Sequence, residues 1–142
     1  MTRPARATLY SPDMLALAVE LASFPYDEGA SYLGEARSRS CGSVLALSFE
    51  GKFENLGLRV TACAVGQASA AIFARHAEGK TAQELQSAKA AIESWLAGGA
   101  DVPQWPDFDK LAPARDYPAR HGAILLPWNA GLDALSKGGA GR

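Results

Sequence analysis

Hydrophobic and polar residues alternate along the middle of the chain, between residues 43 and 62. The first run has an apolar residue at every second position, namely Leu45, Leu47 and Phe49. A second run follows Gly51 and has its own apolar face, formed by Leu56, Leu58, Val60 and Ala62. A period of two is typical of strands with one buried face. The pattern therefore predicts an antiparallel β-hairpin with its turn at Gly51.

Before the hairpin, the period changes to that of a helix. Ser11-Pro12-Asp13 is a typical helix start, because the serine can accept a backbone hydrogen bond and proline suits the first helical position. Apolar residues then recur at helical spacing and are expected to face the core: Leu15, Ala18, Val19 and Ala22. Phe24-Pro25 is expected to end this helix, and a first strand is expected near residues 32–40.

After the hairpin, small residues from Ala64 onward predict an alanine-rich helix that ends at Gly79. Thr81 and Glu84 then have the spacing of a capping box, in which each side chain satisfies a terminal backbone donor. The helix that follows has an apolar side and is expected to end at Gly98-Gly99; that side comprises Leu85, Ala88, Ile92 and Leu96.

Prolines at four positions interrupt residues 100–121, where one short helical turn is expected at 107–111. A last helix is expected over residues 123–135, and Pro127 must either lie in its first turn or kink it. Together these elements predict an α+β fold: an N-terminal helix, an antiparallel sheet of about three strands, and three to four helices packed on one face.

Length and composition support a single domain over residues 1–142, with an ordered core at about 9–135. Hydrophobic residues make up 48% of the chain, charged residues 20%, and the net charge is −1, which gives no electrostatic footprint for nucleic acid or an anionic membrane. No apolar run approaches the roughly 18–20 residues that cross a bilayer. We expect a cytoplasmic protein whose two cysteines are thiols.

Both cysteines lie at the ends of the predicted hairpin. Cys41 precedes its first strand and Cys63 precedes the alanine-rich helix, so the hairpin could bring the two thiols together. A helix N-terminus favours a thiolate at Cys63, whereas the alternative is a small buried hydrophobic residue among alanines. Cys41 could equally be a strand-edge residue without a role, and a Cys41–Cys63 disulfide is a third option. Gln67, one turn after Cys63, could line the same pocket or serve only in capping or packing.

Several landmarks at matching spacings resemble the U-type iron–sulfur cluster assembly scaffold family (IscU, the NifU N-terminal domain and SufU), over about residues 9–135. Cys41-Gly42 resembles the start of the family's Cys-Gly-Asp motif ahead of a strand. Residues 62–70 resemble the segment around the second cysteine, and residues 78–81 resemble the Gly-Lys turn that closes the next helix. The segments 118–120 and 126–128 resemble the flanks of the third cysteine in SufU-type members.

Two departures from this family affect the metal site. Aligned on its flanks, Ala123 stands where the third cysteine is expected, and Ser43 replaces the aspartate of Cys-Gly-Asp. The resemblance implies a site of three thiolates and a carboxylate or histidine that holds a [2Fe–2S] cluster or a zinc ion. Two thiolates complete the ligand shell of neither a zinc ion nor a cluster, since zinc takes four donors and clusters take mostly cysteines. His121 could supply a third ligand, with Asp116 as a weaker candidate, or two chains could share one cluster through four cysteines as a homodimer.

The resemblance implies a non-enzymatic scaffold whose partners are a cysteine desulfurase and other cluster-assembly proteins. In this hypothesis Cys63 or Cys41 accepts sulfur, and Cys41, Cys63 and His121 hold a transient [2Fe–2S] cluster or metal ion, with Ser43 and Gln67 around them. One alternative is a cluster-free module of the same fold that docks on assembly proteins, and another is a zinc-binding sulfur-transfer adaptor. The missing third cysteine favours the cluster-free module, whereas the two retained cysteines speak against it.

Overall fold

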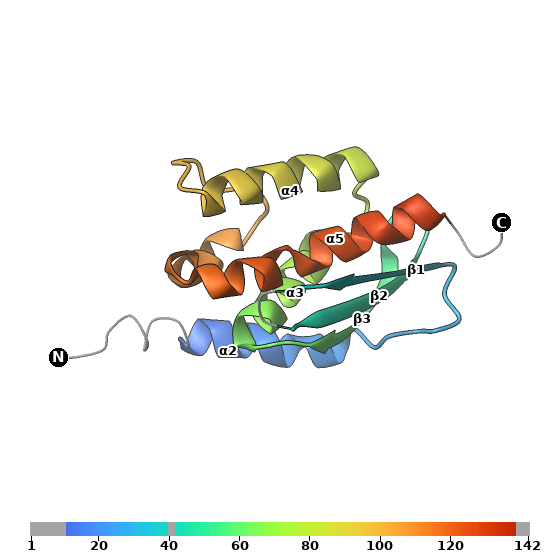
Figure 1. Cartoon of the computed structure of the whole chain (residues 1–142). Helices are drawn as coiled ribbons and strands as arrows, with labels where there is room; N and C mark the ends of the chain where they lie inside the picture. The colour runs from blue at the N-terminus through green and yellow to red at the C-terminus, as the bar shows by residue number, and fades with distance from the viewer. Residues whose placement is uncertain (1–10, 40–41, 139–142) are drawn as a thin grey trace.

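The computed structural model describes residues 11–39 and 42–138 of the chain. Its sheet has three antiparallel strands in the order β1-β2-β3, formed by β1 (Tyr32–Arg37), β2 (Val44–Glu50) and β3 (Glu54–Thr61) (Figure 1). Leu45, Leu47 and Phe49 are completely buried on one face of β2. The predicted hairpin is therefore confirmed, and a further strand precedes it where one was expected.

The register of the hairpin fixes which loop residues meet at the end of the sheet. Val44 pairs with Thr61 and Leu47 pairs with Leu58, while a bulge between Ser48 and Glu50 precedes the turn. Because β2 begins opposite the last residue of β3, the residues just before β2 and just after β3 lie at the same end of the sheet. Gly42 and Ser43 therefore approach Ala62 and Cys63.

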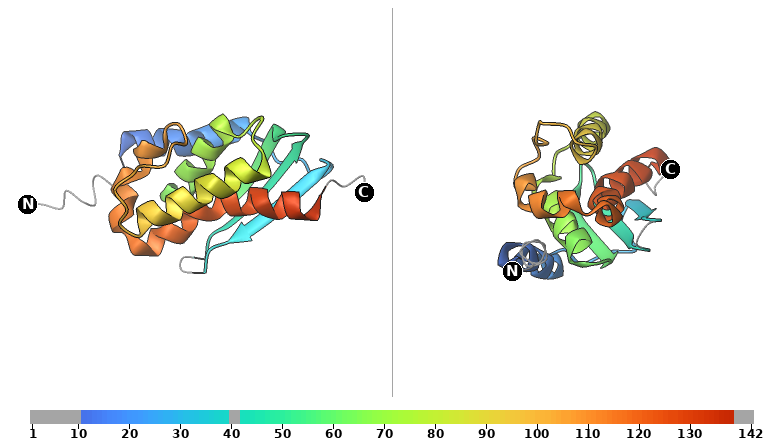
Figure 2. Two further views of the ribbon diagram at one scale, coloured as in Figure 1. Left: turned by 90° about the horizontal axis from the view of Figure 1, so that it is seen from above. Right: turned by 60° about the vertical axis from the view of Figure 1, so that its left-hand side comes forward.

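Helices α3 (Ala64–His76) and α5 (His121–Lys137) cover one face of the sheet, and α4 (Ala82–Leu96) lies outside α5, away from the sheet (Figures 1 and 2). The closest approach is between β1 and α5. A Cβ built on Gly34 would lie only 2.1 Å from the Ala130 carbonyl oxygen and 2.8 Å from the Ala134 Cβ. Only glycine therefore allows α5 to lie directly on β1.

Helix α4 begins with the predicted capping box. The Thr81 hydroxyl accepts a hydrogen bond from the Glu84 backbone N–H at 3.2 Å, and the Glu84 carboxylate accepts one from the Thr81 N–H at 2.9 Å. Leu85, Ile92 and Trp95 are buried on the inner side of the helix. The apolar periodicity of the sequence predicted Leu85 and Ile92 but not Trp95.

The first described helix, α2 (Pro12–Val19), continues as the 3-10 helix η1 (Glu20–Ser23) and packs on α3. The Ser11 hydroxyl accepts from the Met14 N–H at 3.2 Å, as predicted for a cap. The predicted buried stripe is wrong, however, because Met14 and Leu17 face the core while Leu15 is 48% and Val19 76% exposed. Both sets of residues have helical spacing, so periodicity alone could not choose between them.

Residues 108–120 form two 3-10 helices, η2 (Phe108–Asp116) and η3 (Pro118–Arg120), rather than a single short turn. Helix α5 then starts at His121, two residues earlier than predicted, which puts Pro127 in its interior and not in its first turn. Since proline has no N–H, the Ala123 carbonyl loses its partner within the helix. This missing bond falls on the turn that packs against α3.

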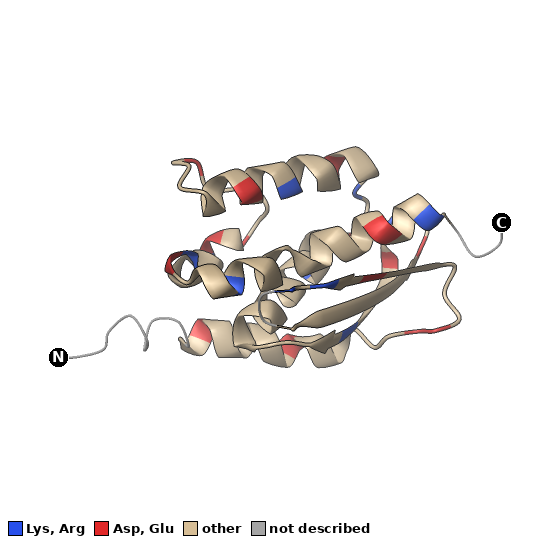
Figure 3. Ribbon diagram, in the orientation of Figure 1, with Lys and Arg blue, Asp and Glu red and all other residues tan. Residues whose placement is uncertain are grey.

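Charged residues of both signs are spread over the described elements (Figure 3). One cluster joins three segments: Arg75 of α3 pairs with Glu20 of η1 and, at 2.9 Å, with Asp107, which also contacts His76 Nε2 at 2.9 Å. These pairs tie η1 and the loop before η2 to the C-terminal end of α3. No helix in the described part of the chain is both long and apolar enough to cross a membrane.

Candidate functional site

A shallow hollow of about 260 Å³ lies at the end of the sheet where β2 begins and β3 ends. We refer to it as the Cys63 hollow. Its lining comes from the residues before β2, from the β3–α3 junction and from η3: Gly42, Ser43, Thr61, Ala62, Cys63 and Arg120. The hairpin register thus assembles a site around one of the two cysteines.

Cys63 is the N-cap residue of α3. Its backbone is extended (φ −67°, ψ 173°), its thiol is free and partly exposed, and it makes no side-chain capping hydrogen bond. The first backbone N–H groups of a helix lack partners inside the helix and carry a partial positive charge. The thiol therefore lies where a negatively charged sulfur would be stabilised.

Gly42 and Ser43 form another part of the lining of the hollow. The Ser38 N–H donates to the Ser43 carbonyl at 2.8 Å, and the Gly42 N–H donates to the Ser38 carbonyl at 3.0 Å. Gly42 has φ +71°, a left-handed conformation that favours glycine. Ser43 is 3% exposed and lines the hollow beside Cys63. Cys41 lies outside the described residues.

Gln67 lies on the first turn of α3 and makes a packing contact with the end of β3. Its Nε2 donates to the Ala62 carbonyl at 2.8 Å, and its backbone N–H donates to the Cys63 carbonyl at 3.0 Å. Gln67 is not among the residues that line the hollow. Its amide instead joins the residue after β3 to the first turn of the helix that begins after Cys63.

Ala123 is completely buried in the first turns of α5. It lies against the helix that begins at Cys63, since a Cβ built on Gly66 would be 3.3 Å from the Ala123 Cβ. The position expected for a third cysteine thus packs one turn away from Cys63, but its methyl group cannot bind a metal ion.

His121 begins α5 and turns one ring nitrogen toward the protein backbone. Its Nε2 lies 2.7 Å from the Arg115 carbonyl oxygen, and because a carbonyl only accepts, Nε2 is the donor in this hydrogen bond. His121 is not among the lining residues of the Cys63 hollow, whereas its neighbour Arg120 is. The structure therefore places Arg120, and not His121, in the lining of the hollow that contains Cys63.

The donors that the described residues contribute to the hollow do not form a metal shell. Cys63 contributes one thiol, Ser43 and Thr61 contribute hydroxyl groups, and Arg120 contributes a positive charge. Among residues 11–39 and 42–138 there is no group of three or more histidine, cysteine, aspartate or glutamate side chains that could hold a metal ion. This set suits a negatively charged ligand better than a bare cation.

Two lining residues were missed by the sequence analysis. Thr61 follows from the register, because it ends β3 directly before Ala62-Cys63. Arg120 had a weaker signal: it lies in the segment that resembles the flank of the third cysteine, but arginines on surface loops are common and nothing local pointed to Cys63. Its place depends on the 3-10 turns of residues 108–120, which bring the start of α5 to the hairpin end.

No protein-family model matches the sequence, and no curated protein sequence is significantly similar to it. Solved structures are similar, however. The N-terminal part of a nitrogen-fixing NifU-like protein from Brucella abortus matches with a TM-score of 0.80 and 28% identity, over 94% of this chain and 96% of that one. The match therefore spans almost the whole of both chains.

A second similar structure is a putative iron–sulfur cluster assembly scaffold protein for the SUF system from the thermophile Fervidobacterium islandicum AW-1. It matches with a TM-score of 0.76 and 25% identity, over 91% of this chain and 98% of that one. A hypothetical protein, 19% identical with a TM-score of 0.63 over 87% of this chain, shares the fold. The predicted α+β architecture is confirmed by these matches.

Proposed function

Because the chain belongs to the U-type iron–sulfur cluster assembly scaffold family, we propose that it takes part in iron–sulfur cluster assembly and that Cys63 is its sulfur-accepting residue. The observation that carries this proposal is the position of Cys63: a free, partly exposed thiol at the N-terminus of α3, in a hollow that also contains Arg120. The N-terminal end of α3 carries a partial positive charge, and Arg120 adds a positive charge to the lining of the hollow.

In the proposed step, the Cys63 thiolate attacks the terminal sulfur of a cysteine persulfide on a desulfurase. A new S–S bond forms between Cys63 Sγ and the transferred sulfur, while the S–S bond of the donor breaks and the donor cysteine leaves as a thiolate. No external oxidant or reductant is needed, because one persulfide is exchanged for another. Arg120 and the first N–H groups of α3 would stabilise the persulfide anion formed on Cys63.

The iron–sulfur cluster is a cargo in this proposal, and a single chain does not hold it alone. The hollow supplies one described thiol, and Ala123 supplies no donor at the third position. Cys41, which precedes Gly42, is proposed as the second thiol, and His121 Nδ1 as a further ligand if the start of α5 rotates. A labile [2Fe–2S] cluster or a zinc ion would then need donors from a partner or from a second copy of the chain.

A cluster-free module that docks on assembly proteins is the second candidate function. It is favoured by the buried methyl group of Ala123, because this side chain removes the third thiolate without leaving space for another ligand. In this case the fold would present the family's docking surface while Cys63 would have no chemical role.

One set of experiments separates the two candidates. Purified protein is incubated with a cysteine desulfurase and L-cysteine, and intact mass is measured without reductant. We expect an added mass of one sulfur atom per chain in the wild type and in Cys41→Ser, and none in Cys63→Ser. Arg120→Gln should slow the transfer, whereas Arg37→Gln, an exposed arginine of β1 that does not line the hollow, should leave it unchanged.

Anaerobic reconstitution with iron and sulfide, followed by visible absorbance and metal analysis, tests whether the protein binds a cluster or a metal ion. A labile cluster that appears together with a doubling of molecular size would indicate a site shared by two chains. Protein that takes up neither sulfur, iron nor zinc, with Cys63→Ser indistinguishable from the wild type, would leave only the docking module.

A further inference from the structure

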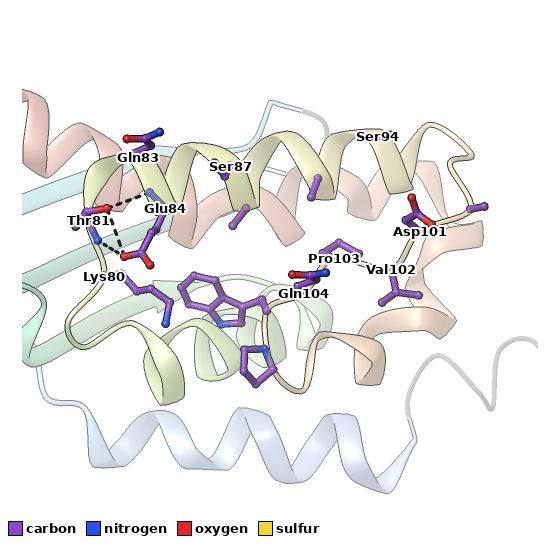
Figure 4. A pocket seen from close by; sticks show the side chains of 15 residues that line it. Lys80, Thr81, Gln83, Glu84, Ser87, Ser94, Asp101, Val102, Pro103 and Gln104 are labelled. Carbon is purple, nitrogen blue, oxygen red and sulfur yellow. Dashed lines mark hydrogen bonds between the residues drawn. The ribbon is translucent and has the colours of Figure 1, made fainter.

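A groove of about 1090 Å³ runs between α4 and residues 100–106, and we call it the α4 groove (Figure 4). It shares no lining residue with the Cys63 hollow. The side of α4 that lines the groove carries small side chains, which leave space between the helix and residues 100–106. These residues are Ser87, Ala88, Ala91 and Ser94. Larger residues at these positions would close the space.

The floor of the groove is rigid. Pro103 and Trp105 are both buried, and Trp105 is 6% exposed. The Trp105 Nε1 donates to the Ile72 carbonyl at 3.0 Å, and its ring stacks on Phe73 with 5.4 Å between the ring centroids. These contacts fix the indole to α3, so the groove is formed before any ligand arrives.

The walls offer hydrogen-bonding groups that the described residues leave open. Ser87, Ser94 and Gln104 are exposed and line the groove, and within the described ranges their side chains make no hydrogen bond. Such groups pair readily with the backbone N–H and C=O groups of a bound peptide. A mixed apolar and polar groove of this kind fits an extended peptide segment.

Opposite charges lie toward the two ends of the groove (Figure 4). Lys80 precedes α4, with its Nζ 5.2 Å from the Trp105 ring centroid, and Asp101 follows the C-terminal end of α4. Neither side chain has an ion pair with any residue in the part of the chain that the structure describes. Glu84, near Lys80, is turned onto the Thr81 cap.

The distance between these ends sets the length of the ligand. Helix α4 has 15 residues, which at a rise of 1.5 Å per residue is about 22 Å. An extended chain rises about 3.3 Å per residue, so about six to seven residues span the same length. A small molecule shorter than this length would not reach both charges.

We propose that the α4 groove binds an extended segment of a partner protein that carries an acidic and a basic residue about six positions apart. The acidic residue pairs with Lys80, the basic residue pairs with Asp101, and small residues between them lie over Trp105 and Ala91. This docking site lies outside the Cys63 hollow and does not depend on the sulfur chemistry proposed for it.

The test uses fluorescence anisotropy with the full chain and a labelled synthetic peptide. The peptide carries aspartate and arginine six positions apart, separated by alanine, serine and proline, and is compared with peptides carrying two aspartates or two arginines. We expect the mixed peptide to bind most tightly and binding to weaken with added salt. Lys80→Glu and Asp101→Lys should each weaken it by about tenfold.

Three further variants sharpen the test. The double variant Lys80→Glu/Asp101→Lys should regain binding, because an extended peptide can enter in the opposite direction. Ala91→Tyr should abolish binding by filling the groove, whereas Ala90→Tyr, at an exposed α4 position outside the lining, should not. Two results would overturn the proposal even if Ala91→Tyr does not fold. One is equal binding of the three peptides to the wild type, and the other is unchanged binding of the mixed peptide to both Lys80→Glu and Asp101→Lys.

Discussion

Gly66 and Ala123 are packed so closely that a Cβ on Gly66 would lie 3.3 Å from the Ala123 Cβ, and 2.7 Å from the Cβ of Ala62. The start of α5 is thus seated on the first turn of α3, directly beyond Cys63. Ala123 lies one helical turn from Cys63, although it does not line the Cys63 hollow, and its methyl group cannot bind a metal ion. Restoring a thiol there, with a carboxylate at Ser43, should restore metal binding.

The double variant Ser43→Asp/Ala123→Cys is therefore predicted to retain about one zinc ion per chain after dialysis, well above the wild type, because it completes a set of cysteine and carboxylate donors. Metal analysis by mass spectrometry measures the difference. Adding Cys63→Ser to the double variant should lower the zinc content again. Equal zinc content in the double variant and the wild type would show that the start of α5 does not point position 123 at Cys63.

Replacement of Gly34 by alanine should destabilise the protein by about 3 kcal/mol, because the new Cβ would collide with backbone atoms of α5 that cannot move aside independently. Urea denaturation followed by circular dichroism provides the free energy of unfolding. Gly29→Ala is the matched control, since a Cβ there meets only the Asp27 carboxylate at 3.4 Å and should cost far less.

Loss of the α4 cap should lower the free energy of unfolding less than the Gly34→Ala substitution does. Thr81→Ala removes the hydroxyl that accepts from the Glu84 N–H and should lower the free energy of unfolding by about 1 kcal/mol. Ser87→Ala, in the exposed middle of the same helix, should be neutral or slightly stabilising, because alanine is the better helix former. A Thr81→Ala variant as stable as the wild type would show that the capping box contributes nothing to folding.

Stability should fall in acid because of the cluster around Arg75. The hydrogen bond from Arg75 lowers the pKa of Glu20, and hydrogen bonds from His76 and then Arg75 lower the pKa of Asp107. A carboxylate with a lowered pKa in the folded state stabilises the fold above its unfolded pKa, and this contribution is lost as the pH falls through the folded pKa. The loss should therefore begin below about pH 4.

Denaturation midpoints measured at neutral pH and at successively lower pH test this expectation. The double variant Glu20→Gln/Asp107→Asn should be less stable than the wild type at neutral pH and should lose less stability on acidification. Asp109→Asn, which removes an exposed carboxylate with no ion pair among the described residues, should follow the wild-type profile. Parallel curves for the wild type and the double variant would rule out this cluster as a source of acid sensitivity.

The hairpin and the capped helix were predictable because their signals are local. Alternation at Leu45, Leu47 and Phe49 and the Thr81–Glu84 spacing each depend on neighbours in sequence, and both predictions are confirmed. The buried face of α2 was not predictable in the same way. Met14 and Leu17 are buried, while Leu15 and Val19 are exposed, because of where α3 packs against α2. This is a tertiary effect.

For the candidate site, the sequence led to Cys63 and to the missing ligand at Ala123, but not to Arg120. The approach of Cys63 to Gly42 and Ser43 follows from strand register, which the alternation predicts. The place of Arg120 depends on how residues 108–120 coil before α5, and proline-rich 3-10 segments have no periodic signal. The orientation of His121 likewise depends on the Arg115 carbonyl, a contact that only the folded loop creates.

The guanidinium of Arg120 also restricts what can enter the Cys63 hollow. Arg120 adds a positive charge to the lining of this hollow, and like charges repel, so it disfavours a free Fe²⁺ or Zn²⁺ ion there. A metal ion already wrapped in sulfide or in another protein's thiolates carries a net negative charge and meets attraction instead. The charge of this hollow would thus select an anionic ligand over a free cation before any bond to Cys63 forms.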